Sequence, residues 1–89
     1  MKTEYLPSFI KDLKKLKKTS IYPEIQLVVF QKIPNCQNIT EIKNLKKIKG
    51  KTNAYRIRVG DHRIGIFIED ETLIFSRVLH RKEVYRYFP

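Results

Sequence analysis

Apolar residues in the first third of the chain recur at the spacing of amphipathic helices. The first stripe comprises Phe9, Ile10, Leu13 and Leu16. The second stripe comprises Ile21, Ile25, Val28 and Val29. Side chains three and four residues apart share one face of a helix, so the pattern predicts two helices, each with one apolar face. Because their connection is short, we expect them to pack as an antiparallel hairpin.

Proline and hydroxyl residues predict where these helices begin and end. Pro7 and Pro23 suit the first turns, where a missing N–H removes no helical hydrogen bond. Thr19-Ser20 interrupts the pattern and predicts an N-cap for the second helix, and Pro34-Asn35 predicts its end. Before the first helix, Lys2–Tyr5 has the length of a short edge strand.

The period of the pattern changes to two at Tyr55. Apolar residues alternate with arginines up to Val59, and a second alternation follows the pair Gly60-Asp61. Alternation predicts two strands, and a glycine at the first turn position favours a type II′ hairpin. That turn predicts four cross-strand pairs: Val59 with His62, Arg58 with Arg63, Ile57 with Ile64, and Arg56 with Gly65.

A second turn at Glu69–Glu71 leads to a third strand, Thr72–Leu79, whose register the pattern leaves open. Residues 35–53 are polar, and we expect an irregular segment. Four aliphatic residues would hold it to the core: Ile39, Ile42, Leu45 and Ile48. The pattern predicts one α+β domain over residues 1–89, in which an N-terminal helical hairpin covers one face of a small three-stranded antiparallel sheet, with Lys2–Tyr5 as a possible further strand at its edge. The order is β-α-α-β-β-β, and the last residues allow a short C-terminal helix.

Net charge indicates the class of partner. The chain carries 19 basic and 9 acidic side chains, a formal charge of +10. Self-repulsion of this size usually accompanies a polyanionic partner, so nucleic acid leads, ahead of an anionic membrane surface or an acidic protein. The hydrophobic share of 42% is too high for a disordered basic tail.

Several classes of protein are excluded. The longest apolar runs, Leu27–Phe30 and Ile64–Ile68, are far shorter than a membrane-spanning helix. The N-terminus lacks the apolar segment of a secretory signal. Cys36 is the one cysteine, which excludes an internal disulfide and a cysteine-based zinc site. We therefore expect a cytoplasmic protein with no metal and no cofactor.

The two kinds of basic residue occupy different parts of the chain. All six arginines follow residue 55, whereas twelve of the thirteen lysines precede it. In the predicted hairpin, Arg58 faces Arg63, and Arg56 lies on the same side beside Gly65. Facing like charges destabilise a strand pair, so we interpret the three arginines as an anion site rather than a solvated strand face. Four lysines extend this site into a predicted RNA-binding track: Lys46, Lys47, Lys49 and Lys51.

The C-terminal segment adds groups that the predicted sheet lacks. His80 is a candidate proton carrier, because the ordinary pKa of histidine is near 6.5. Tyr85 is a candidate for stacking on a base or for proton transfer. We expect Tyr87 and Phe88 to be packed anchors rather than ligands.

Four segments together match one known pattern in order and spacing. Tyr55–Ile64 and Val78–Tyr85 carry the match, and Leu45–Gly50 and Phe9–Leu13 support it. The chain resembles the RelE/ParE toxin superfamily, most closely its RelE branch of ribosome-dependent mRNA interferases. The resemblance covers nearly the whole chain apart from the linker around residues 35–42. The family fold, a curved antiparallel sheet with a helical hairpin, agrees with the fold predicted above.

The resemblance implies the toxin of a toxin–antitoxin system. Such a toxin is a metal-independent endoribonuclease that cleaves mRNA in the ribosomal A site, contacts ribosomal RNA and is held inactive by a cognate antitoxin. The RNA's own 2′-hydroxyl attacks the adjacent phosphate and the 5′-oxygen leaves. Arg56, Arg58 and Arg63 match the family's basic strand residues, Arg81 matches an arginine near its C-terminus, and Tyr85 matches a C-terminal tyrosine. Forked cations of this kind stabilise the charge that develops on the phosphate.

Two departures from the family concern proton transfer. Some relatives have lysines where this chain has Arg56 and Arg58, and an arginine stays protonated, so the strand is a poor source of a general base. Other relatives use a glutamate and histidine pair, and no glutamate aligns here. The proton-transfer candidates are therefore His80 and Tyr85, with their order open.

Two alternative functions follow from the same residues. The first is a ParE-like poison of DNA gyrase, but gyrase-directed relatives generally lack the basic set. The second is a non-catalytic RNA-binding module, in which substitutions would act only through charge and salt dependence.

Overall fold

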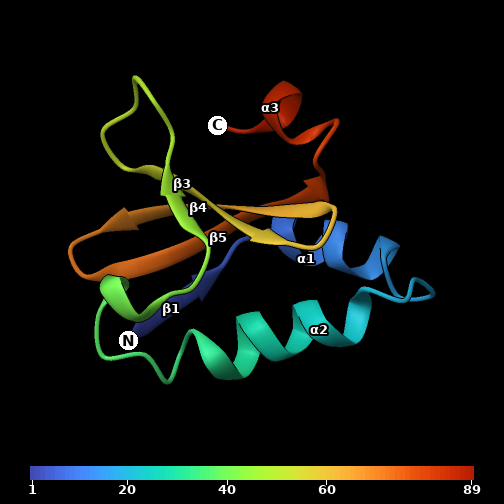
Figure 1. Cartoon of the computed structure of the whole chain (residues 1–89), viewed down its shortest axis with the longest axis horizontal. Helices are drawn as coiled ribbons and strands as arrows, with labels where there is room; N and C mark the ends of the chain where they lie inside the picture. Colours follow the sequence, from blue (N-terminus) through green and yellow to red (C-terminus); the bar gives the residue numbers. More distant parts are fainter.

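The computed structural model describes all 89 residues, and it confirms the predicted α+β architecture (Figure 1). The five strands are β1 (Lys2–Tyr5), β2 (Leu45–Lys47), β3 (Ala54–Val59), β4 (His62–Glu69) and β5 (Thr72–His80). The α-helices are α1 (Pro7–Lys15), α2 (Tyr22–Leu27) and α3 (Val84–Tyr87). A π-helical segment, η1 (Val28–Lys32), continues α2, and a 3₁₀ turn, η2 (Ile39–Glu41), precedes β2. None of these helices has the length and apolar character needed to span a bilayer.

The strands form one sheet in the order β1-β5-β4-β3-β2. The pairs β3–β4 and β4–β5 are antiparallel as predicted, and β2–β3 is antiparallel too, but β1 pairs with β5 in parallel, so the sheet is mixed. The expectation that residues 35–53 are irregular is wrong at Leu45–Lys47, which pairs with β3 as the second edge strand. Two of these three residues are exposed lysines, and an edge strand tolerates such a composition because charged side chains discourage further pairing.

Helices α1 and α2 cover one face of the sheet, and the main core lies between them and the strands (Figure 1). Phe9 and Leu13 of α1 are buried, and Ile25 and Val29 of the second helical segment join them. The sheet contributes the inward side chains Ile57, Val59, Ile64, Ile66, Leu73, Phe75 and Val78. The predicted apolar stripes therefore face the sheet.

The predicted start of the second helix needs one correction. Pro7 and Pro23 do occupy first turns, and the helical segment does end before Pro34. The Thr19-Ser20 pair, however, does not cap α2: its N-cap is Ile21, without a side-chain bond. The Thr19 hydroxyl donates instead to the carbonyl of Leu16, 2.7 Å away, at the end of α1, and the backbone N–H of Thr19 donates to the same carbonyl at 2.9 Å.

The hairpin β3–β4 has the predicted register, including the pairs Arg58–Arg63 and Arg56–Gly65. Gly60 has a φ of +58° while Asp61 does not have a positive φ, as a type II′ turn requires. At the second turn, Asp70 and Glu71 both have positive φ, which is the type I′ pattern that also matches the twist of paired strands.

A β-bulge in β5 reverses which side chains in the second half of the strand face the helices. Gly65 pairs with Arg77 and Ile66 pairs with Phe75, so Ser76 is the extra residue. Leu73 and Phe75 point toward the helices, and after the bulge Val78 does so instead of residue 77. The carbonyl of Ser76 accepts a hydrogen bond of 2.7 Å from the Ser8 hydroxyl at the start of α1.

The C-terminal segment lies on the opposite face of the sheet from α1 and α2 (Figure 1). There Val84 and Phe88 form a small second core with Ala54 of β3. Phe88 is the packed anchor that the sequence predicted, whereas Tyr87 is not, because half of it (51%) remains exposed.

Candidate active site

Three arginines and one lysine converge on the sheet face that the long helices leave free. Arg58 pairs with Arg63 across the hairpin, and Arg56 pairs with Lys46 of β2 on its other side. Because directly paired residues project to the same face, all four side chains share it. Together with Asn44, these four line a surface cavity of about 250 Å³ that has no apolar lining.

The cations of this cavity have no acidic partner. The two ion pairs of the chain join Arg77 to Asp12 and Arg81 to Asp61, and neither reaches the cavity. Burial lowers the pKa of Arg63, and the neighbouring charges of Arg56 and Arg58 lower it further. Crowded, uncompensated guanidinium groups form a site in which an anion relieves repulsion.

Backbone contacts hold one of these guanidinium groups in place. The Nη1 atom of Arg63 donates to the carbonyls of Gly60 and His62, each at 3.0 Å, so the β3–β4 turn orients the side chain. Arg58 makes a long contact of 3.5 Å with Oδ1 of Asn44. Asn44 was not predicted from the sequence as a residue of the site. Its φ is 63°, a conformation that asparagine adopts more readily than most residues. Its residue type is therefore the one signal that the sequence offered for it.

Two C-terminal residues lie within electrostatic reach of the cavity. Tyr85 raises the pKa of Arg63 and Arg81 lowers it. Tyr85 lies on α3 and is 59% exposed, so its phenol is accessible to a ligand. Arg81 is held by its backbone N–H, which donates to the carbonyl of Asp61 at 2.8 Å.

The structure does not bring His80 to this cavity. His80 pairs with His62 across β4 and β5, and their rings lie 5.5 Å apart, edge to face. Both line a separate cavity of about 440 Å³, together with Lys15 and Leu16 from the end of α1. The cause is the bulge at Ser76, which turns His80 to the same face as Val78, away from the arginines.

The predicted RNA-binding lysines do not all reach the arginine cavity. Lys46 lines the arginine cavity, whereas Lys47 pairs with Tyr55 and so projects to the opposite face. Lys49 and Lys51 are exposed in the loop between β2 and β3, which projects beyond the sheet in Figure 1.

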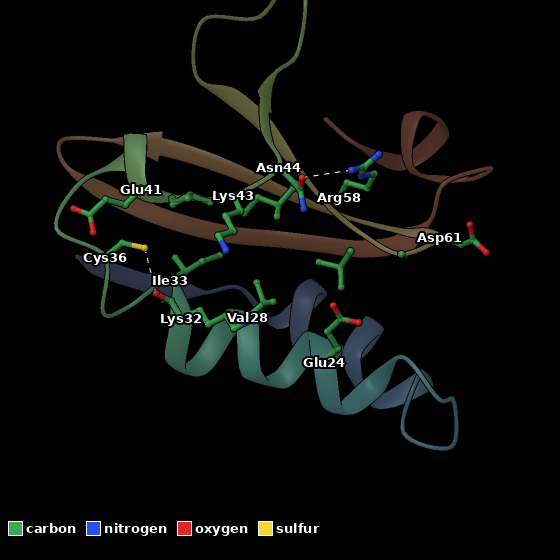
Figure 2. Close-up of a pocket in the computed structure, with 14 residues that line it drawn as sticks. Glu24, Val28, Lys32, Ile33, Cys36, Glu41, Lys43, Asn44, Arg58 and Asp61 are labelled. Carbon is green, nitrogen blue, oxygen red and sulfur yellow. Dashed lines mark hydrogen bonds between the residues drawn. The ribbon is translucent and has the colours of Figure 1, made fainter.

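A larger groove of about 800 Å³ runs between α2 and the β3 edge (Figure 2). Its charged residues balance: Glu24, Glu41 and Asp61 against Lys32, Lys43 and Arg58. In Figure 2, Glu24 and Lys32 lie on the helical side, and Arg58 lies on the sheet side beside Asn44. The balance of charge distinguishes this groove from the arginine cavity, whose charged residues are all cations.

Comparison with known proteins places these features in context. A family model described as "ParE toxin of type II toxin-antitoxin system, parDE" matches residues 3–85. "Toxin RelE3" from Methanocaldococcus jannaschii is 46% identical over 90 residues, with 100% of both chains covered. A crystal structure of the RelB-RelE antitoxin-toxin complex from Methanococcus jannaschii is similar at a TM-score of 0.75 and 44% identity, covering 97% of this chain and 99% of that one. YafQ from E. coli, at 17% identity, has the same fold with a TM-score of 0.73, covering 93% and 96%.

Proposed function

The chain belongs to the ParE toxin family of type II toxin–antitoxin systems and is of the RelE type, and from this premise we propose that it is a ribosome-dependent endoribonuclease that cleaves mRNA in the A site. The observation that supports this proposal is the cavity lined by Lys46, Arg56, Arg58 and Arg63. All its charged residues are cations without an acidic partner, and α1 and α2 lie on the other face of the sheet (Figure 1).

The cavity suits the charge changes of RNA cleavage by internal attack. The 2′-oxygen bonds to the adjacent phosphorus, the bond from phosphorus to the 5′-oxygen breaks, and a 2′,3′-cyclic phosphate and a 5′-hydroxyl result. The phosphorane between these states carries extra negative charge. Arg56, Arg58 and Arg63 stabilise that charge through forked donors, and preorganised donors of this kind are a main source of catalysis.

Proton transfer is assigned to Tyr85 rather than to His80. One proton must leave the 2′-hydroxyl and one must reach the 5′-oxygen. Tyr85 lies on α3, on the sheet face that carries the arginines (Figure 1), and raises the pKa of Arg63, whereas His80 lines a different cavity. A single candidate is an incomplete acid–base set, which suits a substrate that the ribosome already holds in the geometry for in-line attack.

An antitoxin is the proposed protein partner. The relative with 44% identity was crystallised as a RelB-RelE antitoxin-toxin complex. The similarity covers 97% of this chain, which supports a partner of the same kind.

Primer extension on an mRNA translated in vitro tests the proposal. Wild-type protein should create new ends in A-site codons, and Arg63→Ala should slow cleavage about 100- to 1,000-fold, as for other lost transition-state donors. Because Arg63 also binds the Gly60 carbonyl, Arg56→Ala serves as a second variant, since Arg56 makes no side-chain hydrogen bond. Lys14→Ala is the matched control, because it removes one positive charge from the exposed side of α1. It should leave the rate of mRNA cleavage unchanged.

Three results would contradict the proposal. Arrested translation without new mRNA ends would exclude cleavage. DNA damage with intact mRNA would favour a gyrase poison. Equal losses in Arg63→Ala and Lys14→Ala would show that only total charge matters, as expected of a non-catalytic RNA-binding module.

A further inference from the structure

A buried carboxylate holds Arg77 in one orientation. Asp12 of α1 is only 5% exposed. Its Oδ2 accepts from Nε of Arg77 at 2.6 Å, and its Oδ1 accepts from Nη2 at 3.0 Å. The backbone N–H of Val78 donates to the same Oδ2 at 3.1 Å. The two hydrogen bonds from Arg77 to one carboxylate therefore fix the plane of its guanidinium group.

The fixed guanidinium contacts the C-terminal helix. The Cζ atom of Arg77 lies 5.6 Å from the centre of the Tyr87 ring, within the range of a cation–π interaction. Asp12, Arg77 and Tyr87 thus form a chain of contacts from α1 through β5 to α3. We call these three residues the clamp.

The contact at Tyr87 limits the rotation of helix α3. It has four residues and no side-chain N-cap, so it is too short to be stable alone. Val84 and Phe88, four residues apart, share one helical face and are buried against the sheet. At about 100° per residue, Tyr85 and Tyr87 flank this face on opposite sides. A contact at Tyr87 therefore resists rolling of the helix about its buried face, and rolling would move Tyr85.

We propose that the Asp12–Arg77–Tyr87 clamp positions Tyr85 beside the arginine cavity, and that Arg77 is a positioning residue for RNA cleavage. The activity part of this inference rests on the proposed function, since it assumes that Tyr85 acts on RNA there. Arg77 itself does not line the arginine cavity, and its guanidinium is paired with Asp12, so it is not available to the RNA phosphate. Its effect on cleavage passes through α3.

The structural part is tested on the free protein by hydrogen exchange. Two amides report α3: Arg86 N–H, bonded to the Glu83 carbonyl at 3.0 Å, and Phe88 N–H, bonded to the Val84 carbonyl at 2.8 Å. Arg77→Ala and Tyr87→Ala should each speed exchange of both amides at least tenfold and leave the β3–β4 amides unchanged. Tyr87→Phe keeps the ring and should exchange like the wild type. Unchanged α3 protection in both alanine variants would overturn the clamp.

The functional part is tested on ribosomes programmed with mRNA. A small misplacement of a reacting group costs about 10- to 100-fold in rate, so Arg77→Ala and Tyr87→Ala should lower kcat by that amount with KM unchanged. Asp12→Asn keeps an acceptor for Val78 N–H but removes the charge that orients Arg77, and it should lower kcat in the same direction. The double variant Arg77→Ala/Tyr87→Ala should be no slower than the worse single variant.

The outcomes separate the two proposals. A rise in KM with kcat intact would mean that Arg77 contributes binding, and additive losses would mean that Arg77 and Tyr87 act independently; either would overturn the clamp. If the wild type cuts no mRNA, the proposed function fails, while the hydrogen-exchange result still decides whether the clamp orders α3.

Discussion

The ring of Phe88 lies directly over Gly65. A β-carbon at position 65 would come within 2.6 Å of two ring carbons, closer than side-chain atoms pack. The sequence placed Gly65, which has no side chain, beside Arg56, but the C-terminal segment fills the space over the glycine. Gly65 is therefore the position at which the sheet admits the C-terminal anchor.

Gly65→Ala should lower the free energy of unfolding by about 1–3 kcal/mol, the usual effect of overpacking. Urea denaturation measures it. In a Phe88→Ala background the clash is absent, and the same substitution should be neutral or stabilising, because alanine restricts the unfolded chain more than glycine does. A loss of equal size in both backgrounds would contradict the packing explanation.

Replacing Arg58 should stabilise the fold while weakening the site. Arg58 faces Arg63 across the hairpin, and like charges in this position are destabilising by about 0.2–1 kcal/mol. Arg58→Gln should raise the denaturation midpoint at low salt, and the gain should shrink at high salt because the repulsion is screened. Cleavage of mRNA should fall in the same variant. A gain in stability that does not depend on salt would point to a cause other than charge.

Two adjacent lysines should differ in their contribution to RNA binding. Lys46 lines the arginine cavity, and Lys47 projects to the opposite face. Lys46→Ala should weaken binding of a short single-stranded RNA and reduce the slope of log K against log salt by about 1, the contribution of one phosphate contact. Lys47→Ala should change neither. Fluorescence anisotropy across a salt series measures both quantities, and equal effects would show that the RNA does not distinguish the two faces.

The stability of the fold should fall in mild acid because of His62. Burial lowers the pKa of His62 below its ordinary value of 6.5, and His80 lowers it further. The unfolded chain therefore binds a proton that the folded chain binds only at lower pH, so the free energy of unfolding decreases as pH falls below about 6.5. His62→Gln should flatten this dependence, measured by urea denaturation across the pH range. An unchanged slope in the variant would assign the effect to another group.

Local rules predicted the hairpin because its register depends on two turn residues alone. Gly60 sets the turn, and the alternation on both sides then fixes every pair from Val59–His62 to Arg56–Gly65. The convergence of Arg56, Arg58 and Arg63 on one face follows from that register. The helices could also be predicted from the local sequence, because their apolar residues repeat at helical spacing. Four of these residues are buried: Phe9, Leu13, Ile25 and Val29.

The features that the sequence did not predict depend on contacts between distant residues. The parallel pairing of Lys2–Tyr5 with β5 joins residues some 70 positions apart, and no local pattern encodes it. The three residues of β2 contain one apolar side chain, too few for a period. The position of His80 depends on a bulge that leaves no mark in the alternation, because Ser76 and Arg77 are both polar.

The extra residue in β5 has a consequence for the chemistry of the two faces of the sheet. It places the imidazole of His80 on one face, whereas Arg56, Arg58 and Arg63 project from the other. If β5 kept Ser76 but alternated without the bulge, the residues after Phe75 would exchange their outward and inward positions, and the imidazole of His80 would move toward the guanidinium groups. Deleting Ser76 would instead leave the pairs on both sides of the bulge unchanged. In this fold, then, the presence of a bulge in one strand decides which of its side chains reach the exposed side, with no substitution at the site itself.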